Sequence, residues 1–524
     1  MKTFKNLLIA LLFATLCGIN AYAYDFEVDG IYYKYQSIQK KTVAVTSRVY
    51  GIETYSGTVV IPSTVSYLDV EYNVTEIDYS AFSNCDELEK IEIPKGMILI
   101  GDNAFKDCIN LKQVIINEGL ERIGDNAFEG CTSLEEITLP STFYRIGEWT
   151  FYNSGIKSVV FTGDKCATIG YMAFYNTKLS EAHISNVSVI GDMAFYGTQL
   201  KEVVFGDNLK SIGNYAFYGT PLKKVEFGNN LESVGVHAFY MTDIESVDLS
   251  KVTGLKSIDY AFSDCKKLVS VKLPQTLEEI GDEVFKGCAM LENIELPQAL
   301  EIIGKAAFYG CSRLKALDFP ASLKNVHGGA FNGCESLTSL EFPSKVWLHL
   351  WDYESIVDGC NNLKMVKLPG VPLPVYPIFN QVNFETVYAV YGYDNYVPEN
   401  MAELFNAQTY ETAVLRVPVG TKDLYSVTSP WKYFANIEED SSLEMVGIDN
   451  VHKEDNCSIW YAEGKIRHNI ATDVDIEIFG ADGRSVLRCE SASQSVDISD
   501  LPSGVYIVRA NFSGRTIEEK IVVK

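Results

Sequence analysis

The sequence IGDNAFKDCINLKQVII at Ile100 to Ile116 is followed by IGDNAFEGCTSLEEITL at Ile123 to Leu139, so one pattern returns after 23 residues. Both copies contain an Ile-Gly pair, an Ala-Phe pair, a Cys three residues after the Phe, and then alternating apolar residues. Repetition at a fixed period of this length is typical of a solenoid, in which each unit packs against its neighbours. The pattern therefore favours a protein that builds a surface by stacking over one that encloses a single pocket.

Phenylalanine marks the register of the whole array. Twelve copies follow one another at spacings of 21 to 23 residues, at Phe82, Phe105, Phe128, Phe151, Phe174, Phe195, Phe217, Phe239, Phe262, Phe285, Phe308 and Phe331. After each Phe comes an apolar pattern such as Leu134, Ile137 and Leu139, which is typical of a strand with one buried face. We predict about 12–13 turns of about 23 residues, with parallel strand ladders and a tight turn or short helical turn at each GDNAF segment.

Charge excludes some partners. The chain has 524 residues, a formal net charge of −25 and a pI of about 4.7. An acidic surface repels phosphate backbones and anionic lipids. We therefore expect no nucleic-acid partner.

The repeat pattern Ile-Gly-x-x-Ala-Phe-x-x-Cys-x-x-Leu-x-x-Ile-x-Leu-Pro resembles the BspA-like class of leucine-rich repeats, which is found in bacterial surface proteins. The resemblance covers residues 77–369. It implies a mainly β leucine-rich-repeat solenoid. For function, it implies extracellular adhesion and binding to a host protein or another extracellular protein.

The N-terminus has the features of a secretory signal peptide. Lys2 and Lys5 precede the apolar run LLIALLFATL, and the small residues of AYA lie at the cleavage positions. We assign residues 1–23 to the signal and expect no transmembrane segment after its removal, because no later apolar run is long enough. Residues 24–76 contain short β-like runs and are predicted to form an N-terminal β cap over the first open end of the solenoid.

Two further regions follow the repeats. Residues 370–442 are assigned to a C-terminal capping region, and residues 446–524 to a separate antiparallel β-sandwich. Within the second region, GVYIVR at Gly504 to Arg509 and the terminal KIVVK resemble the C-terminal sorting domain of type IX secretion substrates. Together with the signal peptide, this resemblance implies a protein that is exported to the cell surface, the outer membrane or the extracellular space.

Catalytic, cofactor and metal motifs are not evident. The six His are scattered, and the sequence contains no zinc-helix motif, nucleophile elbow or phosphate loop. We expect a non-enzymatic protein without a cofactor or metal, with calcium at the Asp of the IGD triplets as a weaker alternative. The repeat cysteines are predicted to form a buried column of reduced thiols. Disulfides between turns are the alternative.

The candidate binding residues follow the repeat Phe in the five turns that are one residue shorter before the strand. They are Tyr152, Tyr175, Tyr196, Tyr218 and Tyr240, with Tyr309 as an isolated later copy. Stacking in register is predicted to set the five rings about one strand spacing apart. We expect this row to bind an extracellular protein, as in an adhesin. A glycan-binding module is the first alternative, a hydrolytic enzyme is a weaker one, and a purely structural ladder of rings is also open.

Overall fold

The computed structural model describes residues 22–49, 54–165, 167–349, 355–370, 378–390, 404–443, 459–462, 465–468, 474–480, 484–492, 495–502, 504–512 and 515–523. The chain forms two compact units, and the boundary between them falls after Met445. Residues 1–21, which hold most of the predicted signal peptide, lie outside the described residues.

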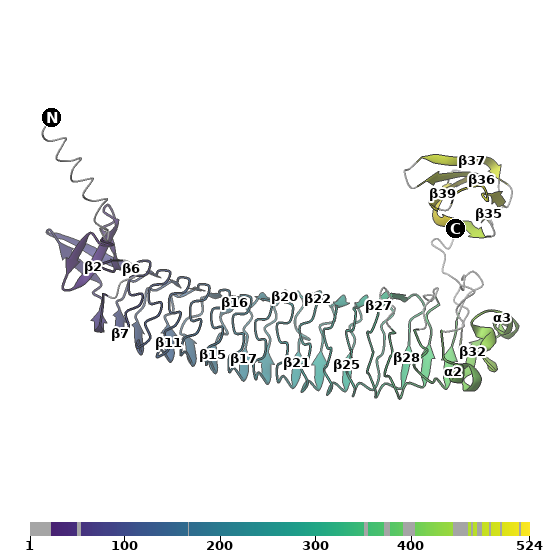
Figure 1. Cartoon of the computed structure of the whole chain (residues 1–524), viewed down its shortest axis with the longest axis horizontal. Helices are drawn as coiled ribbons and strands as arrows, with labels where there is room; N and C mark the ends of the chain where they lie inside the picture. The colour runs from purple at the N-terminus through teal and green to yellow at the C-terminus, as the bar shows by residue number, and fades with distance from the viewer. Residues whose placement is uncertain are drawn as a thin grey trace. The chain divides into compact units, whose positions relative to one another are not determined.

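Unit 1 is a solenoid, as predicted, and one series of its strands lies at or just after the repeat Leu (Figure 1). Each of these strands pairs in parallel with the equivalent strand of at least one adjacent turn, for example Ile137 with Val159. We call this series the leucine ladder. Its strands are β4 (Gly57–Val60), β7 (Leu88–Ile93), β9 (Gln113–Ile116), β11 (Glu136–Leu139), β13 (Ser158–Phe161), β15 (Glu181–His183), β17 (Glu202–Val204), β19 (Lys224–Glu226), β21 (Ser246–Asp248), β23 (Ser270–Lys272), β25 (Asn293–Glu295), β28 (Ser339–Glu341) and β30 (Met365–Lys367).

A second parallel ladder runs beside the first and was not predicted. Most of its strands have only two residues and end at the Ile of the Ile-Gly pair, as in the pairing of Ile123 with Ile146. We call it the isoleucine ladder. Its strands are β8 (Leu99–Ile100), β10 (Arg122–Ile123), β12 (Arg145–Ile146), β14 (Ala167–Ile169), β16 (Val187–Ile190), β18 (Ser211–Ile212), β20 (Ser233–Val234), β22 (Ser257–Ile258), β24 (Glu279–Ile280), β26 (Ile302–Ile303), β27 (Asn325–His327) and β29 (Trp347–His349).

The GDNAF segments connect the two ladders and form a third face, which we call the turn face. They are successive turns, so the tight turn is observed and the short helical turn is not, within the described repeats. Each segment hydrogen-bonds to the next: the Phe105 amide donates to the Ala127 carbonyl at 2.8 Å, and the Phe195 amide to Ala216 at 2.8 Å. All three faces are thus held in register by backbone hydrogen bonds between turns.

The core of the solenoid is a continuous stack of the repeat phenylalanines. All twelve rings are fully buried. Neighbouring ring centroids lie between 4.9 Å, for Phe82 and Phe105, and 6.1 Å, for Phe262 and Phe285. Glycine of the Ile-Gly pair permits this approach, because a Cβ atom at Gly213 would lie 2.5 Å from the backbone nitrogen of Asp192 in the preceding turn.

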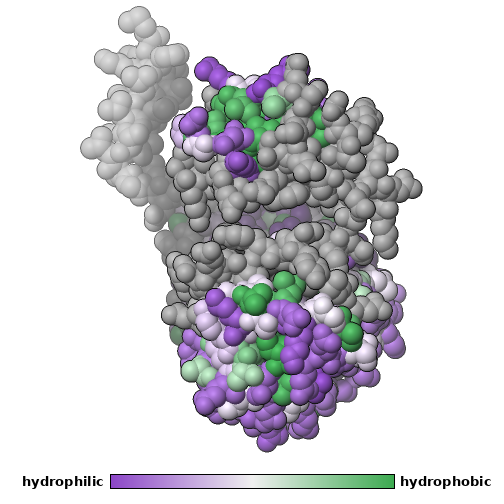
Figure 2. Space-filling view, turned by 90° about the vertical axis from the view of Figure 1, so that its right-hand side faces the viewer, coloured by the Kyte–Doolittle hydropathy of each residue, from purple (hydrophilic) through white to green (hydrophobic). Residues whose placement is uncertain are grey.

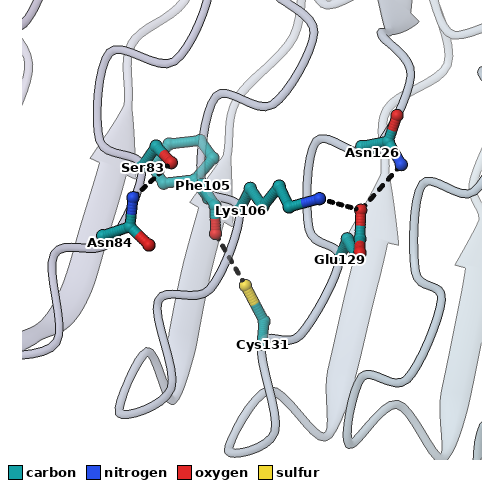
Figure 3. A network of polar contacts seen from close by, with 7 residues as sticks. All are labelled: Ser83, Asn84, Phe105, Lys106, Asn126, Glu129 and Cys131. Carbon is teal, nitrogen blue, oxygen red and sulfur yellow. Dashed lines mark hydrogen bonds and ion pairs between the residues drawn. The ribbon is translucent and has the colours of Figure 1, made fainter. Parts of the chain in front are cut away.

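The repeat cysteines line the core beside the phenylalanines as free, buried thiols. From Cys108 onward, each Sγ donates to the Phe carbonyl of the preceding turn, as Cys131 does to Phe105 at 3.0 Å (Figure 3). In four of the five shortened turns Thr replaces Cys and donates within its own turn, as Thr198 does to Phe195 at 2.9 Å, and in the first Ser154 replaces it. The buried-thiol prediction is confirmed for the described repeat cysteines.

The two ends of unit 1 are covered by elements that depart from the repeat. At the first end, β1 (Phe26–Val28), β2 (Ile31–Ser37) and β3 (Thr42–Thr46) pair antiparallel, and β5 (Thr64–Tyr67) and β6 (Val70–Ile77) continue the sheet into the isoleucine ladder. At the other end, β31 (Thr386–Tyr388), β32 (Val414–Pro418) and β33 (Asn436–Asp440) extend the leucine ladder and are accompanied by α2 (Ala407–Thr412), α3 (Lys422–Val427) and the 3-10 turn η2 (Trp431–Tyr433).

Aromatic side chains close the core at this second end. Tyr425 and Trp431 are buried there, with ring centroids 5.8 Å apart. Figure 2 faces this end, and hydrophilic residues cover most of its coloured surface around smaller hydrophobic areas.

Unit 2 is built from two antiparallel sheets around its own small core, as predicted. One sheet contains β34 (Ile459–Ala462), β35 (Lys465–His468) and β38 (Ser495–Asp497). The other contains β36 (Val474–Gly480), β37 (Ser485–Ala492), β39 (Gly504–Phe512) and β40 (Arg515–Val523). Ile466 and Val496 of the first sheet pack with Ile476, Ile478 and Val508 of the second.

The thiol column predicts slow alkylation of the native protein. Burial raises the pKa of Cys265 to about 12, so this thiol carries almost no reactive thiolate at pH 8. We expect iodoacetamide at that pH to spare the column in the folded protein and to label it fully in denaturant. Cys489 in unit 2 is partly exposed and is the internal control. Peptide mapping that finds the column labelled as fast as Cys489 would contradict the buried arrangement.

Candidate binding surface

The five predicted tyrosines occupy one position of the turn face, directly after the repeat Phe. Their turns are held in register by backbone hydrogen bonds between turns, such as that from the Gly197 amide to the Tyr218 carbonyl at 3.0 Å. The Phe ring points into the core, so the next side chain in the sequence points outward. Each of the five tyrosines is half-buried.

The structure brings all five tyrosines together in one uninterrupted row. Ring centroids lie 5.6 Å apart for Tyr152 and Tyr175, 4.8 Å for Tyr175 and Tyr196, 4.6 Å for Tyr196 and Tyr218, and 5.0 Å for Tyr218 and Tyr240. Neighbouring ring planes are within 28° of parallel. The predicted spacing is therefore observed, whereas a role in binding remains a prediction.

Stacking leaves the ring edges and hydroxyl groups facing outward. The rings of Tyr175, Tyr196 and Tyr218 each have a stacked neighbour on both sides. Burial and the phenols of Tyr218 and Tyr175 raise the pKa of Tyr196. A hydrogen bond to Asp264, with a smaller effect of burial, raises the pKa of Tyr240 to about 12. Both phenols are thus protonated at neutral pH. The Tyr240 hydroxyl already donates to Asp264, and the Tyr218 hydroxyl donates to the Met241 sulfur at 3.9 Å.

A second column of large side chains lies beside the tyrosine row and was not predicted. It occupies the position two residues before the core Phe and contains Trp149, Met172, Met193, Tyr215, His237 and Tyr260. Three of its rings contact the tyrosine of their own turn: Trp149 at 5.0 Å, Tyr215 at 5.9 Å and His237 at 5.0 Å between centroids. We call segments 147–153, 170–176, 191–197, 213–219, 235–241 and 259–264 together the aromatic face.

The second column occupies an unfavourable backbone conformation. All six residues have positive φ, between 50° and 56°. A non-glycine residue in this left-handed region costs about 1–2 kcal/mol, least for Asn and Asp. The two turns before the aromatic face place Asn103 and Asn126 at this position, and the two turns after it place Glu283 and Ala306 there.

A neighbouring column provides an internal comparison. The position two residues after the core Phe also has positive φ. There the described turns from Phe82 to Phe331 use only Gly, Asn or Asp, apart from Met241. Met241 is 50% exposed and belongs to the aromatic face. Bulky side chains are therefore accepted in this strained conformation mainly where they enlarge the aromatic face.

Ion pairs replace the aromatic side chains in the flanking turns. Before the face, Lys106 contacts Glu129 at 2.7 Å and Asn126 donates to the same carboxylate at 2.7 Å (Figure 3). After the face, Lys286 contacts Glu283 at 2.9 Å. Lys286 also lies 5.9 Å from the ring centroid of the isolated copy, Tyr309. The aromatic face is thus bounded at both ends by turns in which the equivalent positions form ion pairs.

The Asp residues of the IGD triplets have a structural partner. The Asp192 carboxylate accepts from the backbone amide of Asn214 in the next turn at 2.8 Å, and Asn214 repeats the contact with Val236 at 2.8 Å. The same bond runs from Asp125 to Asp102 at 2.9 Å. These oxygens fix the register of the turns. Among the described residues, no three His, Cys, Asp or Glu side chains are grouped in a way that could hold a metal ion.

The fold of unit 1 is that of a leucine-rich repeat protein. The family model of the BspA type leucine rich repeat region matches residues 62–180, 167–258 and 238–364, which together span more than half of the chain. The chain belongs to this family. The secretion system C-terminal sorting domain matches residues 462–524, which indicates an exported protein.

Solved structures with similar folds include other bacterial repeat proteins. A leucine-rich repeat protein from Bacteroides ovatus is 27% identical, with 66% of this chain and 94% of that chain covered and a TM-score of 0.47. A leucine rich cell surface protein from Faecalibacterium prausnitzii is 19% identical, with 66% and 90% covered and a TM-score of 0.35. The pneumococcal vaccine antigen PcpA is 19% identical, with 79% and 98% covered and a TM-score of 0.35.

No curated protein matches the chain significantly. Within the described residues, no helix is both long and apolar enough to cross a bilayer.

The hydrogen bond between the Asp192 carboxylate and the Asn214 amide predicts different effects for two substitutions of Asp192. Asp192→Ala removes the acceptor of the Asn214 amide and should destabilise the central turns by about 1 kcal/mol. Asp192→Asn should keep the bond, because Asn214 itself accepts from Val236 through its side-chain oxygen. Hydrogen exchange of the Asn214 amide measures the difference. Equal exchange rates in both variants would show that the carboxylate does not fix the register.

Proposed function

We propose that the protein is a non-enzymatic, adhesin-type binding protein whose aromatic face contacts an extracellular protein. The observation that carries the proposal is the run of bulky residues from Trp149 to Tyr260 at positive φ. Packing within the array does not require them, because Asn103 and Asn126 fill the same position in turns of the same fold. A strained conformation kept over six successive turns supports a role for the side chains themselves.

The orientation of the tyrosine rings favours a protein over a glycan. A sugar ring packs on the face of an aromatic ring, and the faces within the row already contact one another. What remains outward is a series of ring edges and hydroxyl groups, which suits hydrogen bonds and apolar contacts with a polypeptide. Glycan binding is the second candidate and would use the ends of the row, where Tyr152 and Tyr240 each lack one stacked tyrosine neighbour.

Location supports the same function. The match of residues 462–524 to a sorting domain supports export by the type IX route, with residues 1–23 as the signal that directs the first step. The exported protein is then displayed at the cell surface or released. A surface for binding extracellular protein is useful only in that location.

Removing two central rings tests the binding role. Tyr196→Ser together with Tyr218→Ser should abolish binding to the matrix protein that the wild type selects from a panel of extracellular proteins and glycans. The melting temperature should change little, since both side chains are half-buried at the surface. Tyr309→Ser, outside the aromatic face, is the matched control. A large fall in melting temperature with intact binding would make the row a structural ladder, and selective glycan binding would favour the second candidate.

Removing unit 2 tests the export route. A chain that lacks residues 446–524 should be lost from the surface and culture-medium fractions and accumulate inside the cell, because the sorting domain is absent. Cell fractionation with antibody detection gives the measurement. Undiminished surface display of the shortened chain would assign unit 2 another role.

A further inference from the structure

The aromatic face carries negative charge and no positive charge from Lys or Arg. Its six segments contain Glu148, Asp192, Asp259 and Asp264, and not one Lys or Arg. His237 does not offset them at neutral pH, because burial lowers the pKa of its ring. The nearest turn-face cations on either side, Lys106 and Lys286, are each paired with a glutamate.

These carboxylates are held in place without being neutralised by cations of the face. Oδ1 of Asp192 accepts from the amide of Asn214 at 2.8 Å, and Oδ1 of Asp259 accepts from the amide of Asp282 at 3.1 Å. Glu148 is exposed. The face therefore presents fixed anions beside phenol hydroxyls and methionine side chains.

We propose that the aromatic face binds an extended, cationic segment of polypeptide, one rich in Arg or Lys. This inference rests on the proposed function, because it names the kind of protein segment that the same face selects. Complementary charge steers such a segment to the face and excludes acidic segments. Arg and Lys can also hydrogen-bond to the outward tyrosine hydroxyls while their methylene stems pack on Met172 and Met193.

The dimensions of the face fit a short extended segment. The tyrosine row spans five turns, which at about 4.8 Å per turn gives a length of roughly 20 Å. An extended chain rises about 3.3 Å per residue, so about six residues lie along the row. Three extended residues are about as long as two turns of the solenoid. A basic residue at every third position of the segment would therefore contact the face once every two turns.

Other classes of partner fit less well. Nucleic acids, anionic lipids and sulfated glycans carry negative charge and are repelled by the same four carboxylates. An uncharged glycan is not attracted by the negative charge of those carboxylates. The aromatic ring faces on which a sugar ring packs are already in contact with one another within the row.

The test uses the full chain and two synthetic peptides of twelve residues. One peptide has Arg at every third position between Gly and Leu, and the other has Glu in place of each Arg. Fluorescence anisotropy should show binding of the Arg peptide alone, and its affinity should fall as salt is raised, because exposed charges are screened. Equal binding of both peptides, or binding of neither, would overturn the inference.

Charge-neutral variants then locate the contact. Asp192→Asn with Asp259→Asn should weaken binding of the Arg peptide roughly three- to tenfold, the range expected for two partly exposed charge pairs. The control, Asp102→Asn with Asp282→Asn, makes the same change in turns outside the face, where these residues accept from Asp125 and Lys305 at 2.9 and 2.7 Å. Equal weakening by both pairs would mean that general charge, rather than the face, attracts the peptide.

The second column is tested by Met193→Asn with Tyr215→Asn. Asn occupies the same left-handed position at residues 103 and 126, so the fold should be kept while peptide binding is lost. A lower melting temperature with intact binding would assign this column a structural role and overturn its part in the surface.

Failure of this inference is distinct from failure of the proposed function. A protein that binds a matrix protein through Tyr196 and Tyr218 yet ignores both peptides would overturn the cationic partner and leave the proposed function standing. Matrix-protein binding that survives loss of both tyrosines would overturn the proposed function itself.

Discussion

The close approach of successive turns is the constraint on which the rest of the structure depends. A Cβ atom at Gly213 would lie 2.5 Å from the backbone of the preceding turn, and one at Gly124 would lie 2.7 Å from the amide nitrogen of Asp102. Because these positions are glycine, successive turns come close enough for backbone hydrogen bonds to link them on the turn face as well as in the two strand ladders. Each side chain of the repeat then lies beside the side chain at the equivalent position of the next turn. The repeat Phe residues therefore form one continuous buried stack.

The same constraint converts small sequence changes into large surfaces. One tyrosine after the core Phe, repeated in five turns, becomes a row of stacked rings. The residue two positions before that Phe becomes a second row, although its positive φ disfavours the bulky side chains found there. Stacking thus makes the array rigid. It also combines single side chains from several turns into a row of aromatic rings that one turn could not form.

Much of this arrangement could be predicted from the sequence, and the reasons for the gaps are physical. The Phe period predicted the solenoid, and it placed Tyr196 beside Tyr218 because equivalent positions must stack. The isoleucine ladder was missed because a two-residue strand such as Arg122–Ile123 is too short to show alternation. The second column was missed because nothing in the residue types of Trp149 or Tyr215 reveals a left-handed backbone, which favours Asn instead.

Photo-cross-linking from the three faces of the central turns tests most directly whether the turn face makes the contact. A benzophenone amino acid would replace Met193 on the aromatic face, Val189 of the isoleucine ladder or Val204 of the leucine ladder; these valines are 38% and 50% exposed. With the bound extracellular protein, the account predicts a covalent product from position 193 and none from the other two. A product from position 189 or 204, with none from 193, would contradict it.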